Sequence, residues 1–313
     1  MQESVVQRSS RAGEQAEVAR ARPRRRNKKL VAWLFVLPIL MINVVVIIGP
    51  SISAFYYSMT DWSGVGAARF VGFENFRRII FDDITYREAF TNNLIWLTFF
   101  LTVPFALALL AASFLAPIRR GGLFFRTALF IPYVLPSVIV ASIWRNLLSP
   151  TLGVGVQLDK MGIRGLDQAW LGRPDTALLT VAFVDNWRFW GFLMVLFLAA
   201  MQNISPDLYE ASRLDGATRW QEFRFITLPG IRPTIALMIL MVSIWSFLVF
   251  DYVWILTAGG PAGSSEVLGT LVIKHAFNRF QAGYAAAIGL SMSFFAGIVI
   301  TIFVVLRRRG WEV

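Results

Sequence analysis

Charged side chains inside long apolar stretches are the groups in this sequence best placed to do chemistry. Asp185 and Arg188 lie about nine residues into one such stretch, roughly 14 Å deep at 1.5 Å per helical residue. They are three residues apart, so both lie on one face of a helix and can pair. A charge at this depth costs about 2.5–3.5 kcal/mol, and such residues usually serve a function. Two interpretations are open: the pair lines a path for a polar solute, or it is a closed ion pair that joins helices.

A second polar group lies near one end of another apolar stretch, where Asp251 is followed by Tyr252 and Trp254. Aromatic rings with a few hydrogen-bonding groups suit sugars, because sugar C–H faces pack on rings while the hydroxyls need partners. The alternative is that Asp251 only caps the end of its helix. The residues predicted to line a substrate path are Asp185, Asn186, Trp187, Arg188, Asp251 and Tyr252.

A polar segment between two apolar stretches carries its own helix signals. Ser205-Pro206 offers an N-cap side chain followed by proline at the first helical position. Gly216 can adopt a left-handed conformation and end this first helix. Thr218 and Gln221 fit a capping box that starts a second helix. Leu228-Pro229 and Pro233 are expected to end this helix before the fifth span. The segment therefore predicts a helix–turn–helix knuckle.

The elements that must carry these groups are membrane-spanning helices. Apolar residues make up 56% of the 313 residues and charged residues only 16%, and the mean hydropathy is +0.59. A hydrocarbon core of ~30 Å takes about 20 helical residues. We therefore predict an all-α, polytopic membrane protein with six transmembrane helices in one domain over residues 30–306. The six spans are expected near Leu30–Tyr56, Asn93–Ala116, Leu123–Leu148, Thr176–Met201, Thr234–Thr257 and Ala285–Leu306.

Basic residues beside the spans predict the orientation. If the N-terminus is cytoplasmic, nineteen of the 30 Lys and Arg lie inside and nine lie in the outer loops. Both termini and the knuckle, residues 205–228, are then cytoplasmic, with residues 1–29 a disordered basic tail and 307–313 a short second tail. The net charge of +11 could suggest nucleic acid. Orientation and contact with anionic lipid explain it better, because no soluble domain carries a basic stripe.

Several site classes are not expected. The chain has no cysteine, which excludes disulfides and thiolate metal sites. The lone histidine, His275, is expected at the surface of an outer loop. The glycine-rich run 259–263 lacks the Lys-Ser/Thr of a phosphate loop. No set of nucleophile, base and orienting group appears in the spans, so we predict neither an enzyme nor a bound metal or cofactor.

The knuckle resembles a known family. Glu210-Ala211-Ser212, Gly216, Ile226 and Leu228-Pro229 keep the spacing of the cytoplasmic signature of permease subunits of binding-protein-dependent ABC importers. Only Ser212 departs, since the family has alanine there. Outer segments resemble the carbohydrate-uptake branch, the maltose and glycerol-3-phosphate type permeases. These segments are Phe70–Phe76, Pro132 and Pro136 with Trp144, Phe250-Asp251, Leu256-Thr257, Gly259-Gly260-Pro261, Phe277 and Gly283–Ala287.

The resemblance implies a type I ABC importer permease fold in which the knuckle is a coupling helix set into a groove of a cytoplasmic ATPase. It also implies the partners: a second homologous permease subunit, two ATP-binding cassette ATPases and an extracytoplasmic solute-binding protein. Together they would import a sugar by alternating access. The purely structural alternative is a capped loop that only shields the spans. The residues expected to couple to the ATPase are Tyr209, Glu210, Ala211, Ser212, Asp215, Gly216, Ala217, Ile226, Leu228 and Pro229.

Other transport classes remain as alternatives. A permease of the same class could carry glycerol-3-phosphate or another non-sugar solute. A secondary transporter would need inverted repeats or matched ion-coupling carboxylates, and the sequence shows no internal repeat. Small residues at four-residue spacing in the last span favour close helix packing, within the chain or against the partner permease, over a lining role. They are Ala285, Gly289, Ser293, Gly297 and Thr301.

Overall fold

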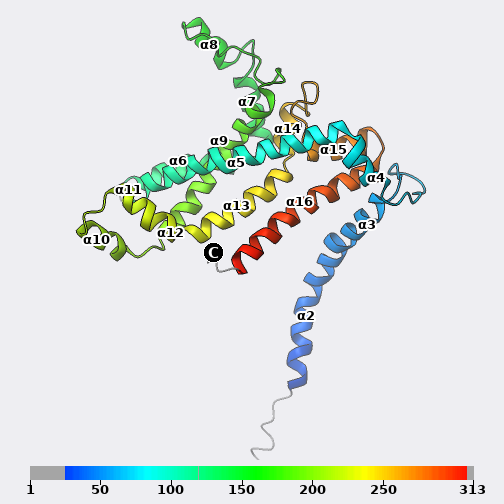
Figure 1. Ribbon diagram of the computed structural model, residues 1–313, viewed down its shortest axis with the longest axis horizontal. Coiled ribbons are helices and arrows are strands. Elements are labelled where there is room, and N and C mark those ends of the chain that lie inside the picture. Colours follow the sequence, from blue (N-terminus) through cyan, green and yellow to red (C-terminus); the bar gives the residue numbers. More distant parts are fainter. Residues whose placement is uncertain (1–24, 119, 309–313) are drawn as a thin grey trace, which may run out of the picture. The chain divides into compact units, whose positions relative to one another are not determined.

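The computed structural model describes residues 25–118 and 120–308, and this part of the chain is helical (Figure 1). It contains no β-strand, only an isolated antiparallel bridge between Thr60 and Phe70. Five helices are long and apolar enough to cross a membrane, or six if one bent helix pair counts as a single span. The predicted all-α class is confirmed.

The chain divides into two compact units, residues 1–54 and 55–313. The first contains α2 (Arg25–Asn43), the π-helical turn η1 (Val44–Ile48) and the start of α3 (Gly49–Ser58). The helix begins at Arg25, five residues before the predicted span, because arginine and lysine are good helix formers that extend the apolar stretch. The preceding residues of the predicted tail, 1–24, lie outside the described part.

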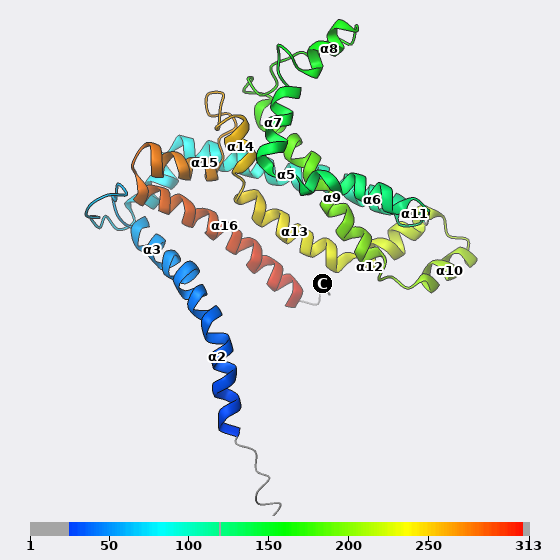
Figure 2. The same cartoon turned by 180° about the vertical axis from the view of Figure 1, so that it is seen from behind.

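The second unit is a bundle of four long helices (Figures 1 and 2). They are α5 (Ile84–Leu115), α9 (Ala177–Met201), α13 (Arg232–Phe247) and α16 (Ala282–Arg308). Helices α9 and α13 pack on α5, and α16 packs on α13. The core of the bundle combines small residues of α5, Ala108 and Ala112, with large residues of α9 such as Phe197, all fully buried. Small residues let membrane helices approach closely, which is what holds such helices together.

The third predicted span, Leu123–Leu148, is present as two helices with a sharp bend between them. The structure has α6 (Gly122–Val134) and α7 (Ser137–Leu147), bent by 96° at the break. Pro136 has no N–H to donate and forces the residue before it out of the helical region, so Leu135 is extended at φ −71° and ψ 136°. The fifth span is also interrupted, after Phe247, and resumes as α14 (Asp251–Leu256).

Short helices connect the long ones. The segment between α9 and α13 lies at one end of the bundle, and α14 and α15 lie at the far end of α13 (Figure 1). The remaining short elements are α4 (Glu74–Arg77), η2 (Arg78–Asp82), α8 (Val154–Lys160), α10 (Pro206–Leu214), α11 (Arg219–Glu222), η3 (Phe223–Thr227), α12 (Leu228–Gly230), α15 (Leu268–Ile273) and η4 (Lys274–Asn278).

Gly191 sets the distance between α6 and α9. A Cβ added there would overlap the backbone carbonyl of Leu129. We expect Gly191→Ala to push the two helices apart and to destabilise the protein by about 1–3 kcal/mol, the usual cost of overpacking. A lower unfolding temperature in detergent checks this. Gly289→Ala is the matched control, because nothing lies within 4 Å of the added Cβ and alanine favours a helix.

Candidate functional site

A cavity of 290 Å³ lies where α13 breaks. Its size is near the lower end of small-molecule sites, which measure roughly 300–1,000 Å³. Its walls come from α5, α6, α9, α13, α14 and the break between the last two. The lining residues are Trp96, Phe100, Tyr133, Asp185, Arg188, Phe189, Val242, Trp245, Ser246, Leu248, Val249, Phe250, Asp251 and Tyr252.

The polar groups of this cavity are incompletely paired. Arg188 Nη2 lies 3.9 Å from Asp185 Oδ1, a loose ion pair. The guanidinium carbon of Arg188 lies 5.1 Å from the ring centre of Tyr133 and 5.6 Å from that of Tyr252. Arg188 Nε and the Tyr252 hydroxyl are buried without a hydrogen-bond partner in the described part of the chain. Buried polar atoms are usually bonded, so these two are the groups of the cavity that a polar ligand would satisfy.

The structure brings together four of the six residues predicted for the substrate path: Asp185, Arg188, Asp251 and Tyr252. Asp251 also accepts a hydrogen bond of 3.3 Å from the Ser137 hydroxyl. The other two do not line the cavity. Asn186 is buried at 4% exposure, and the Trp187 ring packs edge-on against Trp144 with ring centres 5.8 Å apart.

Sequence reasoning missed the aromatic walls. Trp96, Tyr133 and Trp245 come from three other helices, and only the folded chain brings them to the charged pair. Pro132 and Pro136 gave a partial signal, because Tyr133 lies in the last turn of α6 before the bend.

Two consecutive asparagines of α5 hold the broken helix in place. Asn93 Nδ2 donates to the Ser246 carbonyl at the end of α13 (2.7 Å), and Asn93 Oδ1 accepts from the Leu268 N–H at the start of α15 (2.9 Å). Asn92 Nδ2 donates to the carbonyls of Ser264 (3.1 Å) and Glu266 (2.8 Å). A carbonyl freed by a break in a membrane helix must find a partner inside the protein, and Asn93 supplies one for Ser246, while the other three bonds tie the following loop and α15 to α5.

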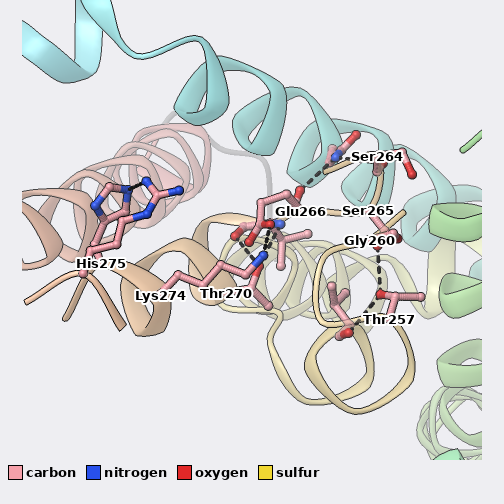
Figure 3. Close-up of polar contacts among 12 residues, drawn as sticks. Thr257, Gly260, Ser264, Ser265, Glu266, Thr270, Lys274 and His275 are labelled. Carbon is pink, nitrogen blue, oxygen red and sulfur yellow. Dashed lines mark hydrogen bonds and ion pairs between the residues drawn. The ribbon is translucent and has the colours of Figure 1, made fainter. Parts of the chain in front are cut away.

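The loop between α14 and α15 is tied together by its own polar side chains (Figure 3). The Thr257 and Ser265 hydroxyls lie 2.8 Å apart, and the Ser265 hydroxyl donates to the Gly260 carbonyl at 2.6 Å. Beneath it the buried Glu266 carboxylate pairs with the Lys274 ammonium. The loop and the first turns of α5 border an open hollow of 480 Å³. No aromatic residue lines this hollow, so it is less suited to a sugar than the cavity at the break.

The structure overturns the prediction that His275 is a surface residue. His275 is fully buried, and its Nδ1 and Nε2 lie 2.9 Å from Gln281 Oε1 and 3.2 Å from Arg279 Nη1. Burial lowers the pKa of this imidazole. The reason for the error is tertiary: η4 folds its histidine against the ring of Tyr284, which the local sequence does not reveal.

Asp83 belongs to the same network. Its Oδ2 accepts from the Tyr284 hydroxyl (2.6 Å) and its Oδ1 from the Tyr86 N–H (3.0 Å). Partial burial acts to raise the pKa of Asp83. The two hydrogen bonds and the Arg78 charge outweigh burial, so the pKa lies below its usual value. Asp83 thus joins the start of α5 to α16 as a carboxylate.

The predicted knuckle is present as a helical hairpin. Helix α10 begins at Pro206 as predicted, although the Ser205 side chain makes no capping bond. Gly216 follows α10 in the left-handed region at φ 79°. The capping box of Thr218 and Gln221 is confirmed. The second helical run, α11 through η3 and α12, ends at Gly230, directly after Leu228-Pro229, and Pro233 lies in the first turn of α13, so the run ends before the fifth span as predicted.

The residues predicted to contact an ATPase lie in and next to this hairpin. Those at the end of α10 and near the turn are mostly exposed to solvent: Glu210, Ala211 and Asp215. Tyr209, Ser212, Ala217, Ile226 and Leu228 are half-buried. Sequence reasoning missed the contacts between the two arms. Arg213 Nε donates to Glu222 Oε1 at 2.8 Å, and the Tyr209 and Thr227 hydroxyls lie 2.9 Å apart.

Comparisons with known proteins agree with this arrangement. Residues 104–309 match the family described as "Binding-protein-dependent transport system inner membrane component". The diacetylchitobiose uptake system permease protein NgcF of Streptomyces coelicolor is 35% identical over 311 residues, which covers 92% of this chain and 87% of that protein. The probable ABC transporter permease protein YurN of Bacillus subtilis is 34% identical over 264 residues, 83% of this chain and 90% of that protein.

The fold is similar to that of a solved transporter. A chain in the crystal structure of a bacterial alginate ABC transporter, in complex with alginate pentasaccharide-bound periplasmic protein, superposes with a TM-score of 0.80. The two chains are 24% identical, and the match covers 90% of this chain and 96% of that one. The ABC importer permease fold that the knuckle implied is therefore confirmed.

Proposed function

Since the chain belongs to the family of binding-protein-dependent transport system inner membrane components, we propose that it forms half of the pathway through which an ATP-driven importer moves a sugar across the cell membrane. The cavity at the α13 break would be the passage for the sugar. The helical hairpin would be the contact with a cytoplasmic ATPase. The excess of basic residues beside this end of the spans supports a cytoplasmic hairpin and cytoplasmic termini.

The observation that carries the proposal is the connection between hairpin and cavity. Helix α9 runs from Arg188 at the cavity to Met201 and then leads into the hairpin. Helix α13 begins at Arg232, directly after the hairpin, and returns to the cavity at Trp245. Each helix spans about 20 Å between the two sites at 1.5 Å per residue. A displacement of the hairpin is thus delivered to two walls of the cavity at once, as alternating access requires.

The chemistry of the cavity supports a sugar. Aromatic rings from five helices offer apolar faces, while Arg188, Asp185, Asp251 and Ser246 offer hydrogen bonds. Relatives named for sugar uptake include NgcF and the multiple sugar-binding transport system permease protein MsmF of Streptococcus mutans, which is 30% identical over 282 residues. A di- or oligosaccharide is therefore the proposed cargo, and glycerol-3-phosphate or another non-sugar solute is the alternative.

The proposal includes the partners of the complex. An extracytoplasmic binding protein would deliver the sugar, a second homologous permease would complete the pathway, and two ATPases would bind the hairpins. The chain itself would do no covalent chemistry. Within the described residues no group of three or more His, Asp or Glu side chains comes together as metal ligands would.

Uptake by the assembled complex tests the function. The complex would be purified from its native host through a tag on this chain and placed in vesicles that contain ATP. We expect labelled maltose or diacetylchitobiose to accumulate only when both ATP and the loaded binding protein are present. If only glycerol-3-phosphate accumulates, the alternative cargo is the correct one and the sugar is not transported. Uptake driven by an ion gradient without ATP would contradict the proposal.

A further inference from the structure

The hairpin at one end of the bundle (Figure 1) has two arms, α10 and the run α11–η3–α12. Three nested contacts join these arms. At the base, a Cβ added to Gly230 would come within 2.7 Å of Ile204 Cδ1. In the middle, the Tyr209 hydroxyl lies 2.9 Å from Thr227 Oγ1. Near the turn, Arg213 Nε donates to Glu222 Oε1 at 2.8 Å. The contacts change from apolar at the base to an ion pair near the tip.

Helix α10 contributes little to the packed core. None of its nine residues is fully buried, only Tyr209 and Ser212 are half-buried, and none belongs to the hydrophobic core. A helix without a buried face is held only by its ends and by its polar contacts. The ends of α10 are the turns at Ser205 and Gly216. The Arg213–Glu222 and Tyr209–Thr227 contacts are therefore what fix α10 on the second arm.

The second arm is more deeply buried than α10. Glu222 and Thr227 are 9% and 7% exposed, whereas the Arg213 side chain is 63% exposed. The Thr227 hydroxyl also contacts the Glu222 carbonyl at 3.4 Å. Four residues later Ile231 is fully buried and belongs to the core, immediately before α13. A force on α10 thus reaches the bundle through the buried ends of these two contacts.

We propose that Arg213 and Glu222, supported by Tyr209 and Thr227, are positioning residues that join α10 to the second arm, so that a displacement of α10 moves α13. This inference rests on the proposed function, because it assigns these residues a part in coupling ATP hydrolysis to transport. It goes beyond contact with the ATPase, since the four side chains act within this chain.

Charge exchange in the complete complex tests the proposal. The readouts are ATP hydrolysis stimulated by binding protein loaded with maltose or diacetylchitobiose, and sugar imported per ATP hydrolysed. We expect Arg213→Glu to lower the stimulation about tenfold, within the usual range of coupling between sites, and to leave basal hydrolysis unchanged. The double variant Arg213→Glu/Glu222→Arg should recover most of the stimulation, because it restores the ion pair in reverse.

Two further variants separate internal positioning from other effects. Arg219→Glu makes the same charge change in the same hairpin, but the Arg219 side chain has no hydrogen bond or ion pair in the described structure. Loaded binding protein should therefore still stimulate ATP hydrolysis by this variant. Tyr209→Phe removes one hydroxyl and keeps the ring, so it folds and should lower the import per ATP. If exchange fails to rescue and Tyr209→Phe is normal, Arg213 acts on the ATPase directly and the proposal is wrong. If Arg219→Glu loses as much stimulation as Arg213→Glu, charge alone is responsible and the proposal is equally wrong.

The wild-type complex distinguishes this inference from the proposed function. A wild type that shows no stimulation by any loaded binding protein and no import removes the function itself. A stimulated wild type with equally stimulated Arg213→Glu and Tyr209→Phe variants removes only the positioning role.

Discussion

A complex carrying Gly216→Val is expected to hydrolyse ATP at its basal rate and to lose its response to sugar-loaded binding protein. Gly216 has φ 79°, a region that a β-branched residue enters at a cost of roughly 1–3 kcal/mol. The Gly216 N–H donates to the Arg213 carbonyl (3.1 Å) and the Ala217 N–H to the Ser212 carbonyl (2.9 Å), which together end α10. Valine relieves its strain by breaking these bonds, which moves α10 and separates Arg213 from Glu222.

Three controls show whether the effect belongs to the hairpin. Nothing lies within 4 Å of a Cβ added at Gly216, so the substitution creates no clash and membrane insertion should be unchanged. Gly66 has φ 77° and equally open surroundings, so Gly66→Val imposes the same backbone strain in another loop and should leave stimulation intact. Gly216→Asn should retain most of the response, because asparagine tolerates the left-handed conformation. Normal stimulation in the Gly216→Val complex would contradict the coupling role of the hairpin.

The hairpin was predictable because its signals are local. Pro206 at the start of a helix, Gly216 at its end and a Thr218–Gln221 capping box each act within four residues, and the structure shows each where it was predicted. The Arg213–Glu222 ion pair was not predicted. Its partners are nine residues apart, and they meet only because the turn at Gly216 folds one arm onto the other.

The features that the sequence did not predict also depend on tertiary interactions rather than on local signals. The hydropathy of the third stretch is continuous, so it indicates a single span, and the bend at Pro136 depends on one missing N–H. His275 gives no local sign of burial, because the ring that covers it belongs to Tyr284. The cavity was predicted only in part, since charges in an apolar stretch are visible in the sequence and the surrounding aromatic rings come from distant helices.

The cavity carries the second large prediction: Arg188→Met should lower sugar uptake roughly 10- to 150-fold while the complex still assembles. A hydrogen bond to a charged group is worth about 1.5–3 kcal/mol, which corresponds to that range. Methionine keeps much of the length and apolar contact of arginine and removes its N–H donors. Arg188→Lys should recover little, because lysine keeps the charge and loses the flat group that lies over the rings of Tyr133 and Tyr252.

The double variant Asp185→Asn/Arg188→Met decides between the two roles of the charged pair. If the pair serves only stability within α9, neutralising both partners removes the unpaired buried charge and uptake should return towards wild type. If Arg188 binds the sugar through its unpartnered Nε, the double variant should remain as inactive as Arg188→Met, and this is the result we expect. Trp187→Phe is the control in the neighbouring position, because Trp187 packs against Trp144 outside the cavity and uptake should be unchanged. The readout is sugar uptake per complex in ATP-loaded vesicles. If uptake recovers in the double variant, the Asp185–Arg188 pair only stabilises the protein, and Arg188 does not bind the sugar.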